Sequence, residues 1–240
     1  MTGELLAVSG VSKQFLGLRA VDDITLSVQK GEIVSIIGPN GAGKTTFFNL
    51  LTGQLAPTAG EVRLRGEQIN RLAPHARAQL GMGRTFQIAK PLIALSALEN
   101  VMIGAFMRHP RLTTARDMAM AVLEKVGLAQ HARRRAGDLT LSERRRLEVA
   151  RALALEPEIV LLDEVMAGLN QSEVGQAIEL LQGLHADGLT FLIIEHNLKV
   201  VRAFSKRVVV LDRGRMIAEG TADQILSSPE VIKAYLGEGH

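Results

Sequence analysis

An apolar run followed directly by a glycine-rich segment is the feature of this sequence that most restricts its fold. Residues 32–37 contain four β-branched residues, which is typical of a strand buried on both faces in a parallel sheet. Residues 38–45 read Gly-Pro-Asn-Gly-Ala-Gly-Lys-Thr and match the pattern Gly-x-x-x-x-Gly-Lys-Ser/Thr. A helical pattern follows over residues 44–51 and is closed by Gly53. This order of strand, loop and helix predicts a phosphate-binding loop in an α/β core.

The chemistry of residues 38–45 suits the phosphates of a nucleotide. Glycines let successive backbone N–H groups turn inward as a concave anion site, and the N-terminus of the following helix adds partial positive charge. Lys44 is expected to reach the β- and γ-phosphates, and the Thr45 hydroxyl to ligate Mg²⁺. A glycine-rich turn that binds nothing is the alternative, but the strand before it and the helix after it favour a nucleotide site. The candidate nucleotide-binding residues are Gly38, Pro39, Asn40, Gly41, Ala42, Gly43, Lys44, Thr45 and Thr46.

A second apolar run, residues 159–162, ends in the acidic pair Asp163 and Glu164. Neighbouring side chains on a strand point to opposite faces, so one carboxylate can serve a metal while the other serves a different group. We assign Asp163 to the Mg²⁺ shell, and Glu164 to the attacking water as general base or orienting group. Such a pair alone could simply lie at the N-terminus of a helix. Its position after the phosphate loop in the chain favours the catalytic interpretation.

Composition excludes several classes of protein. The chain has 47% hydrophobic residues and a mean hydropathy of +0.15, yet its apolar runs are shorter than the roughly 18 residues of a membrane-spanning helix. The first ten residues show neither the basic region nor the cleavage site of a signal peptide. The absence of cysteine excludes a disulfide framework and a thiolate metal site. The apolar strands are therefore expected to be covered on both faces or by a partner.

Charge gives little support for nucleic-acid binding. Lys and Arg number 28 against 25 Asp and Glu, and one Tyr with no Trp leaves little for base stacking. Arginines cluster at residues 133–135 and 144–146, interleaved with Asp138, Glu143 and Glu148. A solvated helix face is the favoured interpretation, and a contact to nucleotide phosphate or anionic lipid is the alternative. We expect no nucleic-acid partner.

Strands alternate with helices along much of the chain, which predicts a covered parallel sheet. Further strands are expected at residues 61–64, 83–86, 189–195, 206–211 and 215–219, with a turn at 212–214. In the middle, Ser96 is expected to cap a helix over 97–106, Thr113 or Thr114 a helix to Val126, and Thr140 to precede a helix over 144–155. Helices are also expected over 172–186, 197–204 and 229–236.

The ordered set of motifs resembles the ATP-binding subunits of ABC transporters over about residues 5–236. Thr85-Phe86-Gln87 is similar to the family's Q-loop and residues 167–170 to its D-loop. His196, directly after an apolar strand, is similar to its switch histidine, and Phe15 lies where the family stacks an aromatic ring on adenine. Each motif alone has an ordinary interpretation: a surface Gln87, an exposed His196, a core-packed Phe15. Together and in this order they are specific.

The resemblance implies a fold of class α/β, a P-loop NTPase (RecA-like) core with a parallel sheet, an antiparallel β N-terminal portion and an inserted α-helical subdomain. It implies a single domain over residues 1–240, with the α/β core in 1–87 and 155–240 and the helical subdomain in 88–154. ATP and Mg²⁺ are the implied ligands, with Thr45, Gln87 and Asp163 around the metal. The implied catalytic residues are Glu164, His196 and Gln87.

One segment departs from the family pattern. Residues 139–143 read Leu-Thr-Leu-Ser-Glu, where the family signature is Leu-Ser-Gly-Gly-Gln and binds the γ-phosphate of an ATP held by the opposite subunit. The resemblance implies this role for Thr140, Ser142 and Glu143. Thr140-x-x-Glu143 also matches a capping box, which would keep the Glu143 carboxylate from the phosphate. Shielding by residues 144–146 is the other way to offset its charge. Val165 replaces a family proline, a change we expect to be tolerated.

Within the family, the sequence is most similar to importers of branched-chain and other hydrophobic amino acids. Residues 83–87, 98–101, 145–153, 163–170, 217–220 and 234–237 carry this similarity, and part of it is shared with lipopolysaccharide exporters and urea importers. The implied protein is a peripheral ATPase on the cytoplasmic side of the inner membrane that powers import. Its implied partners are permease subunits, docking near residues 87–104, and a second ATP-binding subunit, identical or different. No contact with the transported substrate is expected.

Two alternatives stay open. The altered signature is compatible with a regulatory subunit that has a weak composite site. The other alternative is a nucleotide-switched module acting on nucleic acid or the ribosome. Such modules usually have a long coiled-coil insertion or two cassettes in one chain, and this sequence of 240 residues has one phosphate loop.

Overall fold

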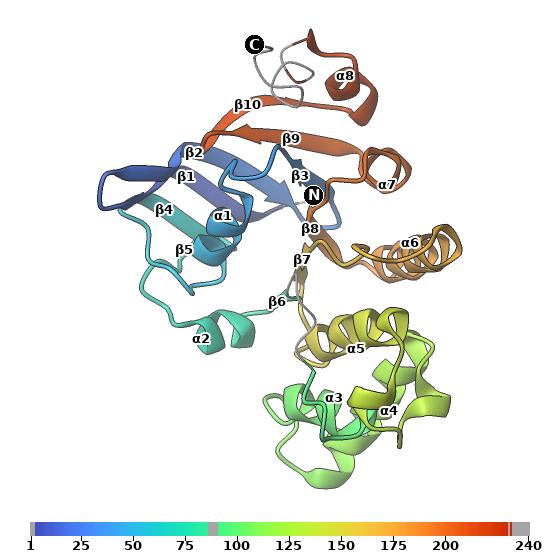
Figure 1. Ribbon diagram of the computed structural model, residues 1–240. Coiled ribbons are helices and arrows are strands. Elements are labelled where there is room, and N and C mark those ends of the chain that lie inside the picture. The colour runs from blue at the N-terminus through green and yellow to red at the C-terminus, as the bar shows by residue number, and fades with distance from the viewer. Residues whose placement is uncertain (1–2, 86–90, 230, 232–240) are drawn as a thin grey trace.

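The computed structural model describes residues 3–85, 91–229 and 231. Two sheets and their covering helices occupy the upper part of Figure 1, and a group of three helices lies below them. No helix in this described part of the chain is long and apolar enough to cross a membrane.

The first sheet is antiparallel and comes from the N-terminal part of the chain. Alternate residues of one strand, Ile24, Leu26 and Val28, are buried, which is the period-two pattern of a strand with one covered face. The predicted antiparallel N-terminal portion is confirmed. In spatial order the strands are β2 (Leu18–Gln29), β1 (Glu4–Phe15), β4 (Ala59–Leu64) and β5 (Glu67–Gln68).

The second sheet has six strands, all parallel except the edge strand β10, which pairs antiparallel with β9. Every residue of β3, β7 and β8 is buried, which accounts for the apolar runs of the sequence. Parallel strands end at one edge of the sheet, where α/β proteins bind ligands. In spatial order the strands are β10 (Arg215–Gly220), β9 (Arg207–Asp212), β3 (Ile33–Ile37), β8 (Thr190–Ile194), β7 (Ile159–Asp163) and β6 (Met82–Arg84).

The two faces of this sheet belong to different hydrophobic cores. Ile159 and Leu161 of β7 pack in a core with the antiparallel sheet and Phe47 of α1. Val160 and Leu162 pack in a second core that includes residues of the helices α5 and α6. The sheet is therefore covered on both faces, as the sequence predicts. The helices around it are α1 (Lys44–Leu51), α2 (Pro74–Gln79), α6 (Gln171–Ala186), α7 (Leu198–Phe204) and α8 (Ala222–Leu226).

The lower helices are α3 (Ala97–Ala105), α4 (Leu112–Lys125) and α5 (Leu141–Leu153), with short 3₁₀ turns at Ala129–His131 and Ala136–Asp138 between α4 and α5. They are inserted in sequence between β6 and β7, as predicted.

Two helix starts differ from the prediction, and one predicted helix lies mostly outside the described residues. The prediction of Thr113 or Thr114 as a helix cap is wrong: the chain is extended at Arg111 (φ −83°, ψ 130°) and enters α4 at once, so both threonines lie in its first turn. Helix α5 begins directly after Thr140, three residues earlier than expected, because the Thr140 cap acts on the residues that follow it immediately. The helix expected over 229–236 falls outside the described residues except for 229 and 231.

Candidate active site

The phosphate loop, residues 38–43, connects β3 to α1. Gly43 precedes the helix with φ 96°, and a Cβ there would lie 2.3 Å from the carbonyl oxygen of Ala20, so only glycine fits. Lys44 Nζ donates to the carbonyls of Gly38 (2.7 Å) and Pro39 (2.9 Å). Burial lowers the pKa of Lys44, while the charges of Glu164 and Asp163 raise it. The ammonium group thus lies in the loop itself, next to both carboxylates of the acidic pair.

Asp163 ends strand β7 and is almost fully buried, with 1% of its surface exposed. Its Oδ2 lies 3.3 Å from Arg84 Nη2 on the neighbouring strand β6, and its backbone N–H donates to the Thr85 hydroxyl. Burial raises the pKa of Asp163, while Arg84 and Lys44 lower it. Its other oxygen, Oδ1, is buried and has no hydrogen-bond partner among the described residues. An orphaned carboxylate oxygen of this kind suits a hard cation such as Mg²⁺.

Glu164 follows Asp163 with a left-handed backbone, φ 49°, a conformation that a non-glycine residue adopts at an energetic cost. Its backbone N–H donates to the Ile194 carbonyl at the end of β8. His196 lies just beyond that strand end, and its Nδ1 is 3.7 Å from Glu164 Oε1. The fold therefore brings together two predicted site residues that are 32 positions apart in the sequence.

An open cavity of about 600 Å³ lies over the phosphate loop. It joins the loop to Glu164, so the lysine and the carboxylate face one space, large enough for a drug-sized ligand. The cavity is also lined by Leu18, Arg19, Ala20 and Arg213.

Phe15 is the last residue of β1, beside the tip of the β1–β2 hairpin. Its ring is 41% exposed, so it is not the core residue of the alternative interpretation. The Lys13 ammonium lies 5.2 Å from the ring centroid. Phe15 does not line the cavity itself, but its hairpin neighbours 18–20 do.

The segment that replaces the signature does form a capping box at the start of α5. The Thr140 backbone N–H donates to Glu143 Oε2 at 2.7 Å, and the Glu143 N–H donates to Thr140 Oγ1 at 3.3 Å. Glu143 also lies 3.0 Å from His131 Nε2 and 3.7 Å from Arg134. Burial raises the pKa of Glu143, but the hydrogen bonds with Thr140 and the nearby His131 and Arg134 outweigh burial, so the net direction of the pKa is down.

Besides the cap, residues 131 and 134 lie beside the Glu143 carboxylate, and not residues 144–146, which were the alternative to capping. Arg144 instead donates to the Gly137 carbonyl, and Arg145 to the Ala167 carbonyl. Residues 140–143 do not line the cavity over the loop. Gln87 lies outside the described residues, so its predicted place near the metal stays a prediction.

Two charged residues of the site were missed by the sequence analysis. Arg84 pairs with Asp163, and also donates to Asn49 and Thr52 of the phosphate-loop helix and its end. Glu195, between β8 and His196, is only 1% exposed. Burial raises the pKa of Glu195, while His196 and the backbone N–H groups of Met166 and Asn197 lower it. Glu195 could have been recognised in the sequence as a charged residue at the end of an apolar strand, whereas no sequence pattern indicates a role for Arg84.

Two models of known protein families match parts of this sequence. The family model described as ABC transporter matches residues 21–167. The chain belongs to the ABC transporter family. A second model, described as branched-chain amino acid ATP-binding cassette transporter, matches residues 215–240 of this ABC chain.

Relatives match along the whole ABC chain. It is 40% identical to LivG of Salmonella typhimurium, described as a high-affinity branched-chain amino acid transport ATP-binding protein, over 99% of this chain and 100% of LivG. It is 41% identical to BraF of Pseudomonas aeruginosa, which has the same description, with the same coverage. It is 37% identical to the lipopolysaccharide export system ATP-binding protein LptB of Escherichia coli, over 97% of each chain.

Solved structures share the fold. A nucleotide-free ATP-binding cassette from an ABC transporter superposes with a TM-score of 0.90 at 32% identity, covering 98% of this chain and 100% of that one. The dimeric ABC transporter cassette MJ0796 has a TM-score of 0.82 at 27% identity, covering 91% and 99%. The predicted fold is confirmed, and the chain is an ABC-type ATPase.

Proposed function

We propose that this ABC ATPase powers the import of branched-chain or other hydrophobic amino acids. The observation that carries the proposal is the full-length match to LivG and BraF, at 40% and 41% identity, together with the match of the C-terminal segment to the branched-chain amino acid cassette model. The match to LptB at 37% makes lipopolysaccharide export the competing function.

The phosphate loop and the acidic pair support the assignment of an ATP site. Lys44 and the loop amides bind the β- and γ-phosphates of ATP, with Gly38, Pro39, Asn40, Gly41, Ala42, Gly43, Thr45 and Thr46 as the other loop contacts. Phe15 packs against the adenine. Thr45, Asp163 and Gln87 hold Mg²⁺, which when bound neutralises charge on the β- and γ-phosphates. The unpartnered Asp163 Oδ1 is what supports this metal assignment.

Glu164 and His196 act on the reaction itself. Glu164 accepts the proton of the attacking water, and its strained backbone at the end of β7 aims the carboxylate into the cavity over the loop. His196, 3.7 Å from Glu164, holds the carboxylate and stabilises charge on the γ-phosphate. Gln87 completes the catalytic group from the Q-loop.

A second ATP-binding subunit, identical or different, completes the site. Its residues 140–143 would approach the γ-phosphate held by this chain's loop, with Thr140, Ser142 and Glu143 in the places of the family signature. The dimeric structure of the MJ0796 cassette supports such an assembly. The capping box answers the objection to Glu143, because its carboxylate accepts the Thr140 N–H and lies beside His131 and Arg134. This favours an active site over a regulatory subunit.

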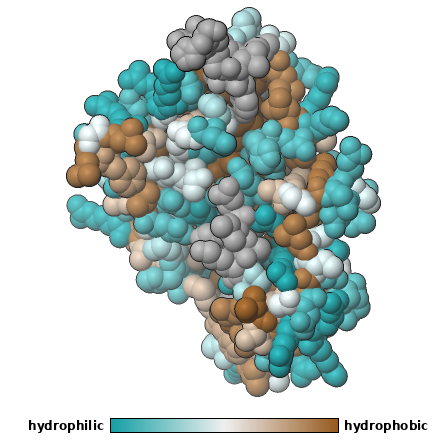
Figure 2. All heavy atoms as spheres, in the orientation of Figure 1, coloured by the Kyte–Doolittle hydropathy of each residue, from teal (hydrophilic) through white to brown (hydrophobic). Residues whose placement is uncertain are grey.

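Apolar side chains on the helical part support a permease partner. Leu92, Ile93, Ile103, Phe106 and Met107 are each 39–65% exposed, and Figure 2 shows brown side chains on this lower part of the molecule. We assign this surface to permease subunits, with the chain peripheral on the cytoplasmic side of the inner membrane and without contact to the transported substrate. The division into a core, 1–87 with 155–240, and a helical subdomain, 88–154, belongs to the same proposal: the subdomain passes motion between the nucleotide site and the permease.

Reconstitution tests this function. The chain is co-expressed with candidate permease subunits, placed in vesicles, and assayed for leucine uptake with MgATP. We expect ATP-dependent uptake that Ile103→Asp abolishes and that Leu112→Asp, the same change at an even more exposed apolar residue of α4, does not. Hydrolysis by the isolated chain should be the same in both variants. Uptake of no branched-chain amino acid, or uptake insensitive to Ile103→Asp, would contradict the proposal.

A further inference from the structure

We infer that Arg213, in the turn between β9 and β10, binds the α,β-diphosphate of the nucleotide from the part of the cavity wall beside the phosphate loop. This inference rests on the proposed ATP site and adds to it a contact from an element that carries none of the motifs. Three observations support it: the turn is fixed to the phosphate loop, Arg213 lines the same cavity, and its guanidinium has no partner among the described residues.

The turn has one defined backbone conformation. Arg213 has φ 46° and Gly214 φ 83°, and two successive positive φ angles are the mark of a type I′ hairpin turn. Asp212 and Arg215 pair across it. A two-residue turn of this type holds the backbone of Arg213, its first central residue, in one conformation.

The turn is also attached to both neighbours of the nucleotide site. The Gly214 N–H donates to the Ala42 carbonyl of the phosphate loop at 3.0 Å, and the Gly214 carbonyl accepts from the Asp22 N–H of β2 at 2.8 Å. A Cβ on Gly43 would lie 3.4 Å from the Gly214 Cα, and one on Gly38 would lie 2.1 Å from the Leu211 carbonyl oxygen. Loop and turn therefore touch through their backbones, and Arg213 keeps a constant position relative to the loop.

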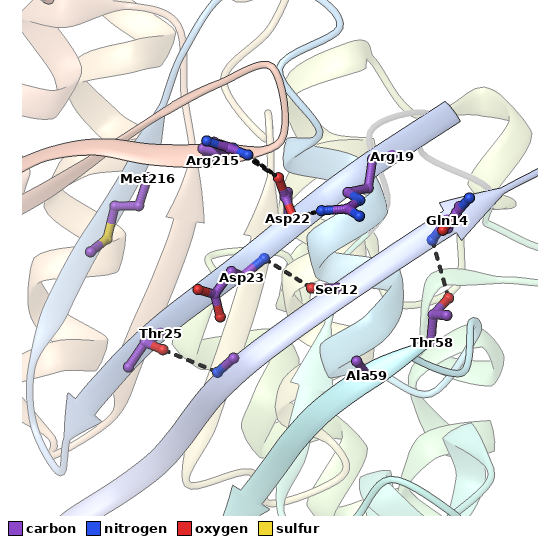
Figure 3. A pocket seen from close by; sticks show the side chains of 11 residues that line it. Ser12, Gln14, Arg19, Asp22, Asp23, Thr25, Thr58, Ala59, Arg215 and Met216 are labelled. Atoms are coloured by element: carbon purple, nitrogen blue, oxygen red, sulfur yellow. Dashed lines mark hydrogen bonds and ion pairs between the residues drawn. The ribbon is translucent and has the colours of Figure 1, made fainter. Parts of the chain in front are cut away.

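Arg213 lines the same cavity as residues 40–46 of the loop and Glu164. Its guanidinium forms no hydrogen bond or ion pair with any residue in 3–85, 91–229 or 231. The neighbouring arginines differ. Figure 3 shows Arg19 and Arg215 both directed at the carboxylate of Asp22, at 2.8 and 2.7 Å.

The chemistry of the free group identifies its ligand. Guanidinium donors match the oxygens of a phosphate in a two-pronged geometry, and such charge-assisted bonds are stronger than neutral ones. Leu18 and Ala20, which follow Phe15 in the β1–β2 hairpin, line the cavity together with the loop. A nucleotide lying between them presents its diphosphate to Arg213, and this group is present in both ADP and ATP. An arginine that is only solvated is the competing interpretation.

Calorimetric titration of the full chain with MgADP and with a non-hydrolysable MgATP analogue tests the inference. The main variant is Arg213→Asn, since asparagine tolerates positive φ in this turn; Arg213→Lys keeps the charge. The matched control is Arg215→Ala, two residues away, which removes a guanidinium bound to Asp22 instead. Thermal melting of each variant verifies that the fold is retained.

We expect Arg213→Asn to lower the binding affinity for both nucleotides equally, by about five- to tenfold at low salt, as the loss of one charge-assisted bond predicts. The loss should shrink at high salt, Arg213→Lys should recover part of it, and Arg215→Ala should stay within about twofold of the unmodified chain. Affinities within twofold for Arg213→Asn, or a loss confined to the triphosphate analogue, would overturn the inference while leaving the proposed function intact. A chain that binds neither nucleotide in its unmodified form would overturn both.

Discussion

Glu143 is the residue whose bonding matters most for the altered signature. A free carboxylate next to a γ-phosphate would repel it, yet this one accepts the backbone N–H of Thr140 and lies beside His131 and the guanidinium of Arg134. The net lowering of its pKa means that it stays ionised in the fold. The charge that replaces the family's glutamine is therefore directed at the helix cap and its neighbours.

This bonding predicts a difference between two variants of Glu143. Glu143→Ala removes the capping box and should lower the free energy of unfolding by about 1 kcal/mol. Glu143→Gln keeps an acceptor for the Thr140 N–H and should lose less. Urea unfolding at pH 7 measures both. Equal stability of the alanine variant and the unmodified chain would show that the cap contributes nothing.

Contacts between residues close together in the chain can be predicted from the sequence, whereas contacts between distant residues cannot. The capping boxes at Ser96 and Thr140 lie within four residues of chain, so the spacing of residue types alone predicts them. The Arg84–Asp163 pair joins residues 79 positions apart, and Glu164 meets His196 across 32. Such contacts depend on which strands are neighbours in the sheet, and no local pattern encodes the order β8-β7-β6. The Glu164–His196 meeting was inferred only through the family resemblance.

At the scale of elements, helix α1 depends on a buried charge. Arg77 of α2 is 1% exposed and donates to the carbonyls of Leu50 and Leu51 at the end of α1, and also to those of Leu72 and Asn70. Burial lowers the pKa of Arg77 to about 10, so it is still charged at pH 7. A cation at the C-terminus of a helix satisfies free carbonyls and opposes the helix dipole.

Replacing Arg77 should therefore weaken the α/β core at the far end of the phosphate-loop helix. Arg77→Ala leaves four carbonyls without their donor and should cost about 3 kcal/mol. Arg77→Lys keeps the charge without the forked donors and should cost less. Chemical denaturation compares them with Arg71→Ala, a change at an exposed arginine that should stay within about 0.5 kcal/mol. A loss for Arg77→Ala no larger than that control would contradict this role.

Elements also differ in how far the sequence predicts them. Strands β3, β7 and β8 were expected from apolar runs because burial on both faces leaves no polar alternation to misread. The start of α4 was misplaced because both threonines are good caps, while Arg111, which does occupy the cap position, offers no capping side chain. The turn at residues 212–214 was expected, but its hydrogen bond to Ala42 is a tertiary contact that its sequence does not specify.

At the scale of the whole molecule, the fold places its reactive groups at one sheet edge and leaves half of the proposed composite site to a partner. Glu164 faces the cavity over the phosphate loop, whereas residues 140–143 lie on the separate helical part and do not line that cavity. A chain built this way should hydrolyse ATP well only when two copies, or this chain and a relative, meet around the nucleotide. In the proposed function, dimerisation driven by ATP is the property that would connect the site to transport.

The variant Glu164→Gln tests whether this carboxylate is needed for hydrolysis but not for ATP-driven dimerisation. Glu179→Gln is the charge-matched control at an exposed position. We expect sedimentation to show the Glu164→Gln chain as a monomer with MgADP and a dimer with MgATP. Its turnover should fall by about a hundredfold or more, as expected for loss of a general base, while Glu179→Gln behaves as the unmodified chain. Near-normal turnover by Glu164→Gln, or a failure to dimerise with MgATP, would contradict the account.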